Sequence, residues 1–218
     1  MRSFPETQPI GLSPLPSASS PSKAGRFLFL LIILYYLPPL LLLSGHLPFT
    51  WRFQILAFMT VIMLAYDWWH GLSLRELGFR TDNLKGSLLL NSFVSLLLVL
   101  FMFLSFKAGL IRTPTAPVWK LFFAYYLLIS SPSQEFLFRS NLFALMHRHN
   151  IRGAILQVIV AAATFSFLHV FYKDPLILVA TFAIGILWGV IYYKYPNFWG
   201  VALSHAVVGV AAILTGLV

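Results

Sequence analysis

The sequence predicts an all-α protein, a polytopic membrane bundle of about seven transmembrane helices. One reason is composition: of 218 residues, 59% are hydrophobic and only 10% are charged. A soluble domain carries about a quarter charged residues, because its surface faces water. The other reason is a series of apolar segments, each long enough to cross a hydrocarbon core of about 30 Å at a helical rise of about 1.5 Å per residue. They are residues 27–44, 53–69, 86–106, 118–147, 153–172, 175–193 and 197–217.

Residues 1–25 precede the first apolar segment and are rich in Ser and Pro, which predicts a flexible N-terminal tail. A cleaved signal peptide does not fit, because a long polar stretch comes before the apolar run; a short transit peptide stays open as an alternative. We expect residues 26–218 to form one transmembrane helical domain, since the loops between the apolar segments are short.

The segment 118–147 is about 45 Å long as a helix, too long for one simple span. It contains Pro132, which lacks an amide donor and predicts a kink or an interruption. Ser131 and Gln134 have the spacing of a capping box around a restarted helix. A helix that restarts at membrane depth is tolerated only where protein or a wet cavity surrounds it. This segment therefore indicates a functional site in the interior of the bundle.

The net charge of +9 comes from basic residues that stand singly between apolar runs. This pattern favours anchoring at the membrane surface, so we expect membrane lipid as a partner and no nucleic acid. With a cytoplasmic N-terminus, the inside segments hold Arg2, Lys23, Arg26, Arg75, Arg80, Lys85, Arg148, Arg152 and Lys194. The outside segments hold Arg52, Lys107, Arg112, Lys120 and Lys173. The excess on the inside predicts that orientation. Residues 72–80 form an amphipathic stretch that we expect to lie on the membrane surface.

Four ionisable residues lie within the last four spans: Glu135, Arg139, His169 and His205. Such groups cost about 2.5–3.5 kcal/mol each on insertion, so they are functional candidates. Glu135 and Arg139 are spaced i,i+4 and can form an ion pair, which by itself is as consistent with a structural as with a catalytic role. Two His from separate spans beside this pair favour a catalytic site.

The residue types fit hydrolysis of a carbonyl compound. A carboxylate and an imidazole can share a water and remove its proton, and a second imidazole can donate to the oxyanion. Two His and one carboxylate could instead bind a metal, so zinc stays an alternative although we expect no cofactor. The sequence contains no HExxH motif. It also contains no cysteine, which excludes thiolate catalysis, disulfides and Cys-ligated metals.

Other polar residues have simpler interpretations. His147 and His149 flank a span end and are predicted to be interfacial, and Asp67 stands beside two Trp at a membrane boundary as a structural residue. Gly185 and Gly189 form a GxxxG face, which predicts close helix packing that holds the His-bearing spans together.

Four motifs occur in order: QEFLFR at 134–139, FSFLH at 165–169, FAIGILWG at 182–189 and HA at 205–206. This set resembles the type II CAAX prenyl endopeptidases and the bacteriocin-processing or self-immunity (Abi) proteins, whose pattern is EExxxR, FxxxH, a Gly-rich span and HxxxN or HxxxD. The resemblance runs from about Leu72 to the C-terminus, with residues 118–218 resembling the family's catalytic core.

The resemblance implies an intramembrane endopeptidase in which a Glu and the first His activate water. Carried over to this chain, Glu135 and His169 would act on the water, His205 would donate to the oxyanion and Arg139 would orient the motif helix. It also implies a multi-pass protein, which we place in a bacterial plasma membrane, with a peptide or membrane-protein substrate.

The sequence departs from the family pattern at two positions. Gln134 stands where the first Glu is usual, and Gly209 stands where the Asn of the oxyanion site is usual. These departures favour an alternative, a catalytically silent member that binds a peptide or acts as an immunity or scaffold protein. A third interpretation, an ion or proton carrier, is disfavoured because no repeated halves are visible.

Overall fold

The computed structural model describes residues 21–110 and 119–217, and within these ranges it contains helices and no strand. The all-α prediction is therefore confirmed. The long helices are α3 (Arg52–Trp69), α4 (Leu84–Lys107), α8 (Ala154–Phe167), α9 (Pro175–Lys194) and α10 (Phe198–Thr215). The first helical run comprises α1 (Pro21–Leu30), the π-helical η1 (Leu31–Tyr36) and α2 (Leu37–Leu43), and short 3₁₀ turns form η2 (Phe49–Trp51) and η5 (Val170–Tyr172).

Six helical stretches of the described residues are long and apolar enough to cross a membrane. They are Gly25–Leu43, Phe49–Trp69, Leu84–Lys107, Ala154–Tyr172, Pro175–Lys194 and Phe198–Thr215. Each coincides with a predicted span, so the chain is a multi-pass membrane protein. Residues 1–20 of the predicted tail lie outside the described residues, as do Arg2 and Arg112 of the orientation argument, and α1 already begins at Pro21.

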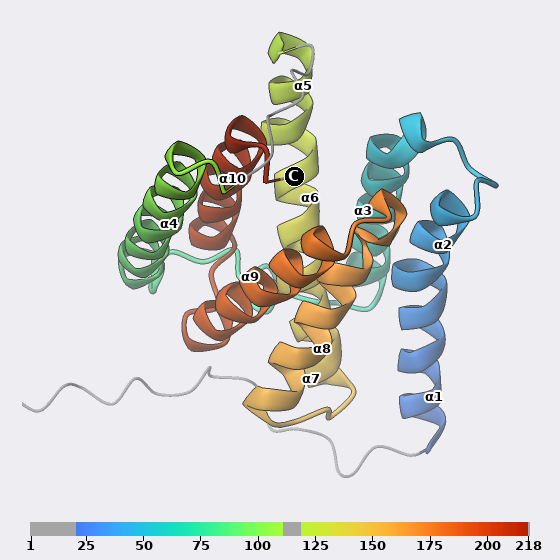
Figure 1. The fold of residues 1–218 in the computed structure, drawn as a ribbon. Coiled ribbons are helices and arrows are strands. Elements are labelled where there is room, and N and C mark those ends of the chain that lie inside the picture. Colours follow the sequence, from blue (N-terminus) through green and yellow to red (C-terminus); the bar gives the residue numbers. More distant parts are fainter. Residues whose placement is uncertain (1–20, 111–118, 218) are drawn as a thin grey trace, which may run out of the picture.

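The predicted span 118–147 is a seventh long helix, assembled from five consecutive pieces. They are α5 (Trp119–Tyr125), η3 (Tyr126–Ser130), α6 (Ser131–Glu135), η4 (Phe136–Asn141) and α7 (Leu142–Arg148). Figure 1 shows this helix, in yellow-green to yellow, in the middle of the bundle. α6 contacts α10 on one side and α3 on the other, and α4 packs against α10. The most polar helix of the chain is therefore the one that protein surrounds, as the cost of polar groups in lipid requires.

Pro132 does not interrupt this helix, so the prediction of a restarted helix is wrong. The π-helical segment η3 ends immediately before α6, and its wider turn accommodates the ring and the missing donor of Pro132. The predicted capping box is also wrong. Ser131 Oγ donates to the carbonyl of Ala202 at 3.4 Å, and Gln134 Nε2 donates to Ser130 Oγ at 2.9 Å.

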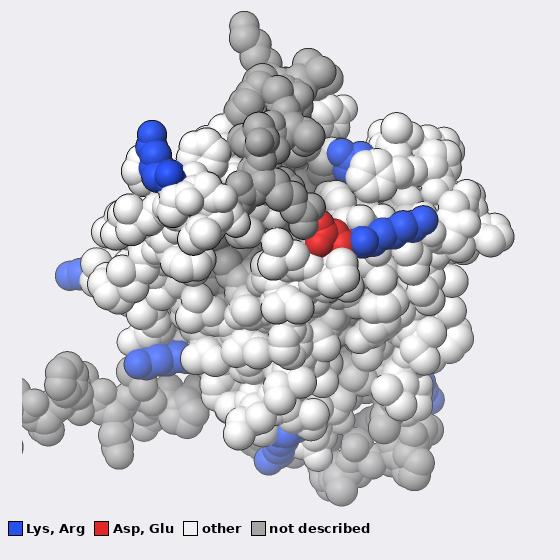
Figure 2. Space-filling view, in the orientation of Figure 1, with Lys and Arg blue, Asp and Glu red and all other residues white. Residues whose placement is uncertain are grey.

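The outer helices are apolar toward lipid and polar toward the bundle. On α4, Leu96 and Phe101 are exposed, whereas Ser87, Asn91 and Ser95 are buried. Figure 2 shows a surface that is white over most of its area, with isolated Lys and Arg side chains. This distribution is opposite to that of a soluble protein and agrees with a lipid-facing surface.

The predicted GxxxG face packs α9 against α8. A Cβ added at Gly185 would lie 3.0 Å from Ala162 Cα, and one at Gly189 would lie 3.2 Å from Val158 Cγ1. Both approaches are closer than ordinary van der Waals contact, so the missing side chains allow the two backbones to come together. α8 ends two residues before His169, so this contact holds the segment that carries the first candidate His.

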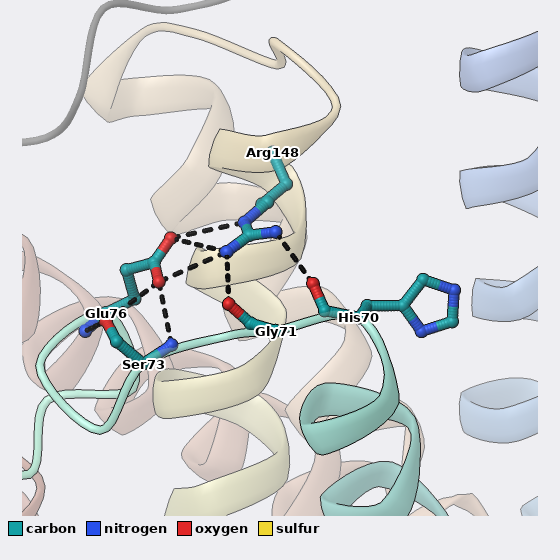
Figure 3. A network of polar contacts seen from close by, with 5 residues as sticks. All are labelled: His70, Gly71, Ser73, Glu76 and Arg148. Atoms are coloured by element: carbon teal, nitrogen blue, oxygen red, sulfur yellow. Dashed lines mark hydrogen bonds and ion pairs between the residues drawn. The ribbon is translucent and has the colours of Figure 1, made fainter.

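The loop between α3 and α4 folds onto the bundle. Leu77 is buried, and the carbonyl of Gly78 accepts a hydrogen bond from Phe198 N at 2.9 Å. Figure 3 shows Arg148, at the end of α7, donating to the carboxylate of Glu76 and to backbone carbonyls of the same loop. The prediction that residues 72–80 lie with their apolar face on the membrane surface is thus wrong for Leu77, which faces protein.

Candidate active site

Glu135, Arg139 and His205 converge in the interior of the bundle. Glu135 ends α6, Arg139 lies in η4, and both side chains are fully buried. Arg139 Nη1 donates to Glu135 Oε1 at 3.0 Å, which confirms the ion pair predicted from the i,i+4 spacing. The same oxygen lies 2.5 Å from Nδ1 of His205 on α10. One carboxylate oxygen thus joins the long helix in the middle of the bundle (residues 119–148, called the central helix below) to α10.

Aromatic rings enclose this group. The guanidinium carbon of Arg139 lies 4.2 Å from the ring centroid of Phe165 and 5.3 Å from that of Trp188. The Trp188 ring stacks on His205 at 4.7 Å and 22°, and its Nε1 donates to Ser204 Oγ at 2.9 Å. The rings exclude water, which strengthens both the ion pair and the cation–π contacts.

His169 does not join the other three candidates. Its ring meets the edge of Phe165 at 5.1 Å, and Phe165 meets His205 on α10 at 5.7 Å. Phe165 therefore contacts both imidazoles. Hydrogen bonds join Glu135, Arg139 and His205, and His169 lies beside Phe165 at the turn that follows α8.

A cavity adjoins His169. Its volume, counted as the space open to the centres of water molecules, is about 40 Å³, so it can hold more than one water. Gln134 and His169 both line it, together with Arg52, whereas Glu135 and His205 do not. The remaining lining residues are Pro38, Pro39, Leu42, Phe53, Ile55, Leu56, Met59, Ser130, Leu168, Phe171 and Tyr172. The cavity is thus mostly apolar, with a few polar groups on its wall.

Two polar atoms at this cavity have no hydrogen-bond partner among the described residues: Gln134 Oε1, an acceptor, and Arg52 Nε, a donor. Arg52 lies against the rings of Phe49 and Phe53, 4.3 and 4.5 Å from their centroids, so its guanidinium is held in place. Such groups can bind the donors and acceptors of a peptide.

Hydrogen bonds fix which nitrogen of each imidazole carries a proton. His169 Nδ1 lies 3.0 Å from the carbonyl of Phe165, and since a carbonyl only accepts, Nδ1 is the donor. Nε2 of the neutral ring is then free to accept a proton. His205 Nδ1 likewise donates to the Glu135 carboxylate, which balances the charge of the ring when Nε2 is also protonated. One His can act as a base and the other as a donor.

The donor set does not form a metal centre. Among the described residues, no group of three His, Cys, Asp or Glu side chains is placed to hold a metal ion. Glu135 Oε1 already accepts from Arg139 and His205.

Sequence reasoning missed a second buried polar group. Asp67 is 1% exposed, and its two carboxylate oxygens accept from Asn141 Nδ2 at 2.7 and 2.8 Å. Tyr35 donates to Asn141 Oδ1 at 2.5 Å. This network ties η1 and α3 to η4. The sequence predicted a structural residue at a membrane boundary and not this network, and the isolated charge of Asp67 within a span was the available signal for a buried partner. His147 and His149 lie outside this network and outside the cavity.

Comparison with known families agrees with the motif set. Residues 116–211 match the family model described as type II CAAX prenyl endopeptidase Rce1-like. This part of the chain is Rce1-like. No curated protein and no solved structure matches the chain significantly.

The Rce1-like segment runs from α5 into α10 and contains all four candidate residues. The family that it matches is a family of proteases, which confirms the resemblance drawn from the motifs. Within the Rce1-like segment, Gln134 faces the cavity with His169, and Gly209 lies four residues after His205 on α10.

Proposed function

We propose that the protein is an intramembrane endopeptidase that hydrolyses a peptide bond with a water activated at the cavity. The observation that carries the proposal is that the Rce1-like segment holds Gln134 and His169 on the wall of one cavity, next to the Glu135–His205 pair. The apolar lining suits an apolar peptide segment, and the polar wall suits its backbone.

In the proposed reaction, Nε2 of His169 takes a proton from water while the water oxygen attacks the carbonyl carbon of the substrate. The amide oxygen of Gln134 orients the water by accepting its second proton as a hydrogen bond. The resulting tetrahedral oxyanion collapses, the C–N bond breaks, and His169 returns its proton to the leaving amine.

The other residues act on the oxyanion. His205, protonated on both nitrogens, donates from Nε2 to the developing charge, and Glu135 balances the charge of its ring. Arg139 is a positioning residue that holds Glu135 in its rotamer. The family resemblance implied that Glu135 acts on the water together with His169. In this scheme Glu135 instead supports His205, because its carboxylate oxygen accepts from His205 and Arg139.

Single replacement of Glu135, His169 and His205 by Ala tests the proposal, with His46→Ala as the control because His46 is exposed and does not line the cavity. The chains are reconstituted in liposomes with a set of quenched fluorogenic apolar peptides. We expect turnover in the parent and in the control and none in the three variants. Cleavage at parental rate by all three variants would rule the assignment out.

We propose that the reaction uses no metal. A strong chelator added to the same assay is expected to leave turnover unchanged. Loss of turnover that zinc restores would contradict this and would require the side chains to rearrange.

A second candidate function is a catalytically silent peptide-binding or scaffold protein. The specific observation in its favour is that no carboxylate is among the residues that line the cavity, since Gln134 occupies that position. The two functions separate in one measurement: turnover that depends on His169 excludes the silent protein, whereas peptide binding without turnover supports it.

We further propose that the protein lies in a bacterial plasma membrane with its N-terminus in the cytoplasm. The absence of cysteine allows single-cysteine labelling from either side. Leu74 and Leu110 are 69% and 79% exposed and lie in successive loops. We expect Leu74→Cys to react only from the cytoplasmic side and Leu110→Cys only from the outside. The reverse result would invert the orientation.

A further inference from the structure

Gly209 lies one turn after His205 on the same face of α10. A Cβ at this position would collide with the hydroxyl of Tyr126 and would lie 2.5 Å from its Cζ. The hydroxyl of Tyr126 therefore occupies the space that a side chain at position 209 would fill. The Tyr126 ring also meets His205 edge-on, with ring centroids 6.2 Å apart and planes at 63°. Hydroxyl and imidazole are thus neighbours.

Tyr126 lies on the cavity-facing side of the central helix. Tyr126, Ser130 and Gln134 are spaced by four residues along one continuous helix, so they lie on one face. Ser130 and Gln134 both line the cavity. Tyr126 begins the π-helical segment η3, and π-helical turns re-aim side chains and are frequent at functional sites. Tyr126 does not itself line the cavity, and its ring contacts His205 on α10.

The hydroxyl is also unused. Tyr126 is 9% exposed, yet in the described part of the chain its oxygen makes no hydrogen bond. The oxygen is not among the fully buried polar atoms that lack a partner, so it is able to donate to a bound molecule. A donor of this kind beside His205 is suited to an oxygen that becomes negative during the reaction.

We propose that the Tyr126 hydroxyl donates a hydrogen bond to the carbonyl oxygen of the scissile peptide bond and, with His205, stabilises the oxyanion. This inference rests on the proposed hydrolysis. Gly209 on α10 then leaves the space that the hydroxyl of Tyr126, on the central helix, occupies.

Tyr126→Phe removes the oxygen and leaves the ring in place. We expect kcat for the fluorogenic peptides to fall by about 10²–10³-fold, the usual effect of deleting one oxyanion donor, while KM changes little. Tyr125→Phe is the matched control, because Tyr125 is adjacent, exposed and not in contact with His205. A peptide phosphonate, which carries a tetrahedral anionic group, should bind more weakly to Tyr126→Phe than to the parent chain. A substrate-like peptide should bind equally well to the parent chain and to Tyr126→Phe.

A double replacement provides the rescue. Tyr126→Ala clears the space beside position 209, and Gly209→Asn then supplies an amide donor from the other helix. We expect the double variant to turn over faster than Tyr126→Ala alone. Gly209→Asn alone should be destabilised, because Tyr126 is still in place; thermal unfolding in detergent reports this.

The outcomes separate this inference from the proposed function. If Tyr126→Phe retains parental kcat while His205→Ala is inactive, the role of Tyr126 is wrong and the hydrolysis stands. If the parent chain shows no turnover of any peptide, both are overturned. A fall in kcat with equal loss of substrate-like peptide binding would overturn the oxyanion role in favour of a structural one.

Discussion

Glu135 and His205, seventy residues apart in sequence, share a hydrogen bond of 2.5 Å in the interior of the bundle. The neighbouring Gln134 points elsewhere, onto the cavity that His169 lines. Adjacent positions of a helix project about 100° apart, so one motif serves two different surroundings. The cavity and the charged pair thus lie on separate faces of the central helix.

Gln134→Glu should raise turnover. A carboxylate at position 134 would face the cavity beside His169 and could take the proton of water, which a Gln amide cannot do. Since general bases contribute about 10²–10⁴-fold, we expect kcat to rise by about tenfold or more in the liposome assay. Gln134→Met, of similar shape, is the control and should lower turnover. An unchanged rate in Gln134→Glu would mean that position 134 does not contact the reacting water.

The Glu135–Arg139 pair should be strongly coupled in stability. Both side chains are fully buried, so removing Glu135 leaves the charge of Arg139 unpaired, and removing Arg139 leaves Glu135 with His205 as its remaining partner. We expect Glu135→Gln and Arg139→Met each to cost about 3–5 kcal/mol, and the double variant to cost less than the sum. Denaturation in detergent measures the cycle. Additive effects would show that the ion pair contributes no net coupling.

The two glycines of α9 should differ in their tolerance of a methyl group. A Cβ at Gly185 meets the backbone of Ala162, which cannot move aside, whereas one at Gly189 meets a side-chain methyl of Val158. Overpacking costs about 1–3 kcal/mol. We therefore expect Gly185→Ala to lower the thermal midpoint more than Gly189→Ala does. The opposite order would mean that α8 and α9 pack differently.

The hydrogen bonds that Glu76 accepts in the loop between α3 and α4 should make the free energy of unfolding depend on pH in the acid range. Burial acts to raise the pKa of this carboxyl, but hydrogen bonds from Ser73 and Arg148 outweigh it and hold the pKa below its usual value of 4.5. A group whose pKa is lower in the folded state stabilises the protein above the unfolded pKa, and this stability is lost as pH falls through the folded pKa.

Glu76→Gln tests this loop effect directly. The difference in unfolding free energy between parent and variant should be present at neutral pH and should shrink as pH falls below about 4.5. The effect should be modest and should weaken in salt, because the side chains of Arg148 and Glu76 are 37% and 25% exposed. A difference that grows at acid pH would contradict the lowered pKa.

Local spacing was sufficient to predict much of this protein. The seven helical segments follow from runs of apolar residues, and the Glu135–Arg139 pair follows from helix geometry, because both depend only on neighbours in sequence. The motif order was sufficient to predict the family, which the match over residues 116–211 supports.

Sequence patterns failed where packing between distant helices decides the outcome. Pro132 predicted a kink or an interruption, yet the helix continues through it, with a π-helical segment directly before α6. The same patterns could not predict that Phe165 contacts both His169 and His205, since that depends on how α8 and α10 pack against each other.

By itself, the sequence determined the membrane helices, the buried ion pair and the protease family of the segment that carries it. Only the tertiary structure decided that Gln134 and His169 line one cavity, that Glu135 reaches His205, and that Tyr126 fills the space beside Gly209. The physical reason is that periodicity fixes which residues share one helix face, whereas the rotation of each helix against its neighbours is set by side-chain packing across the whole bundle.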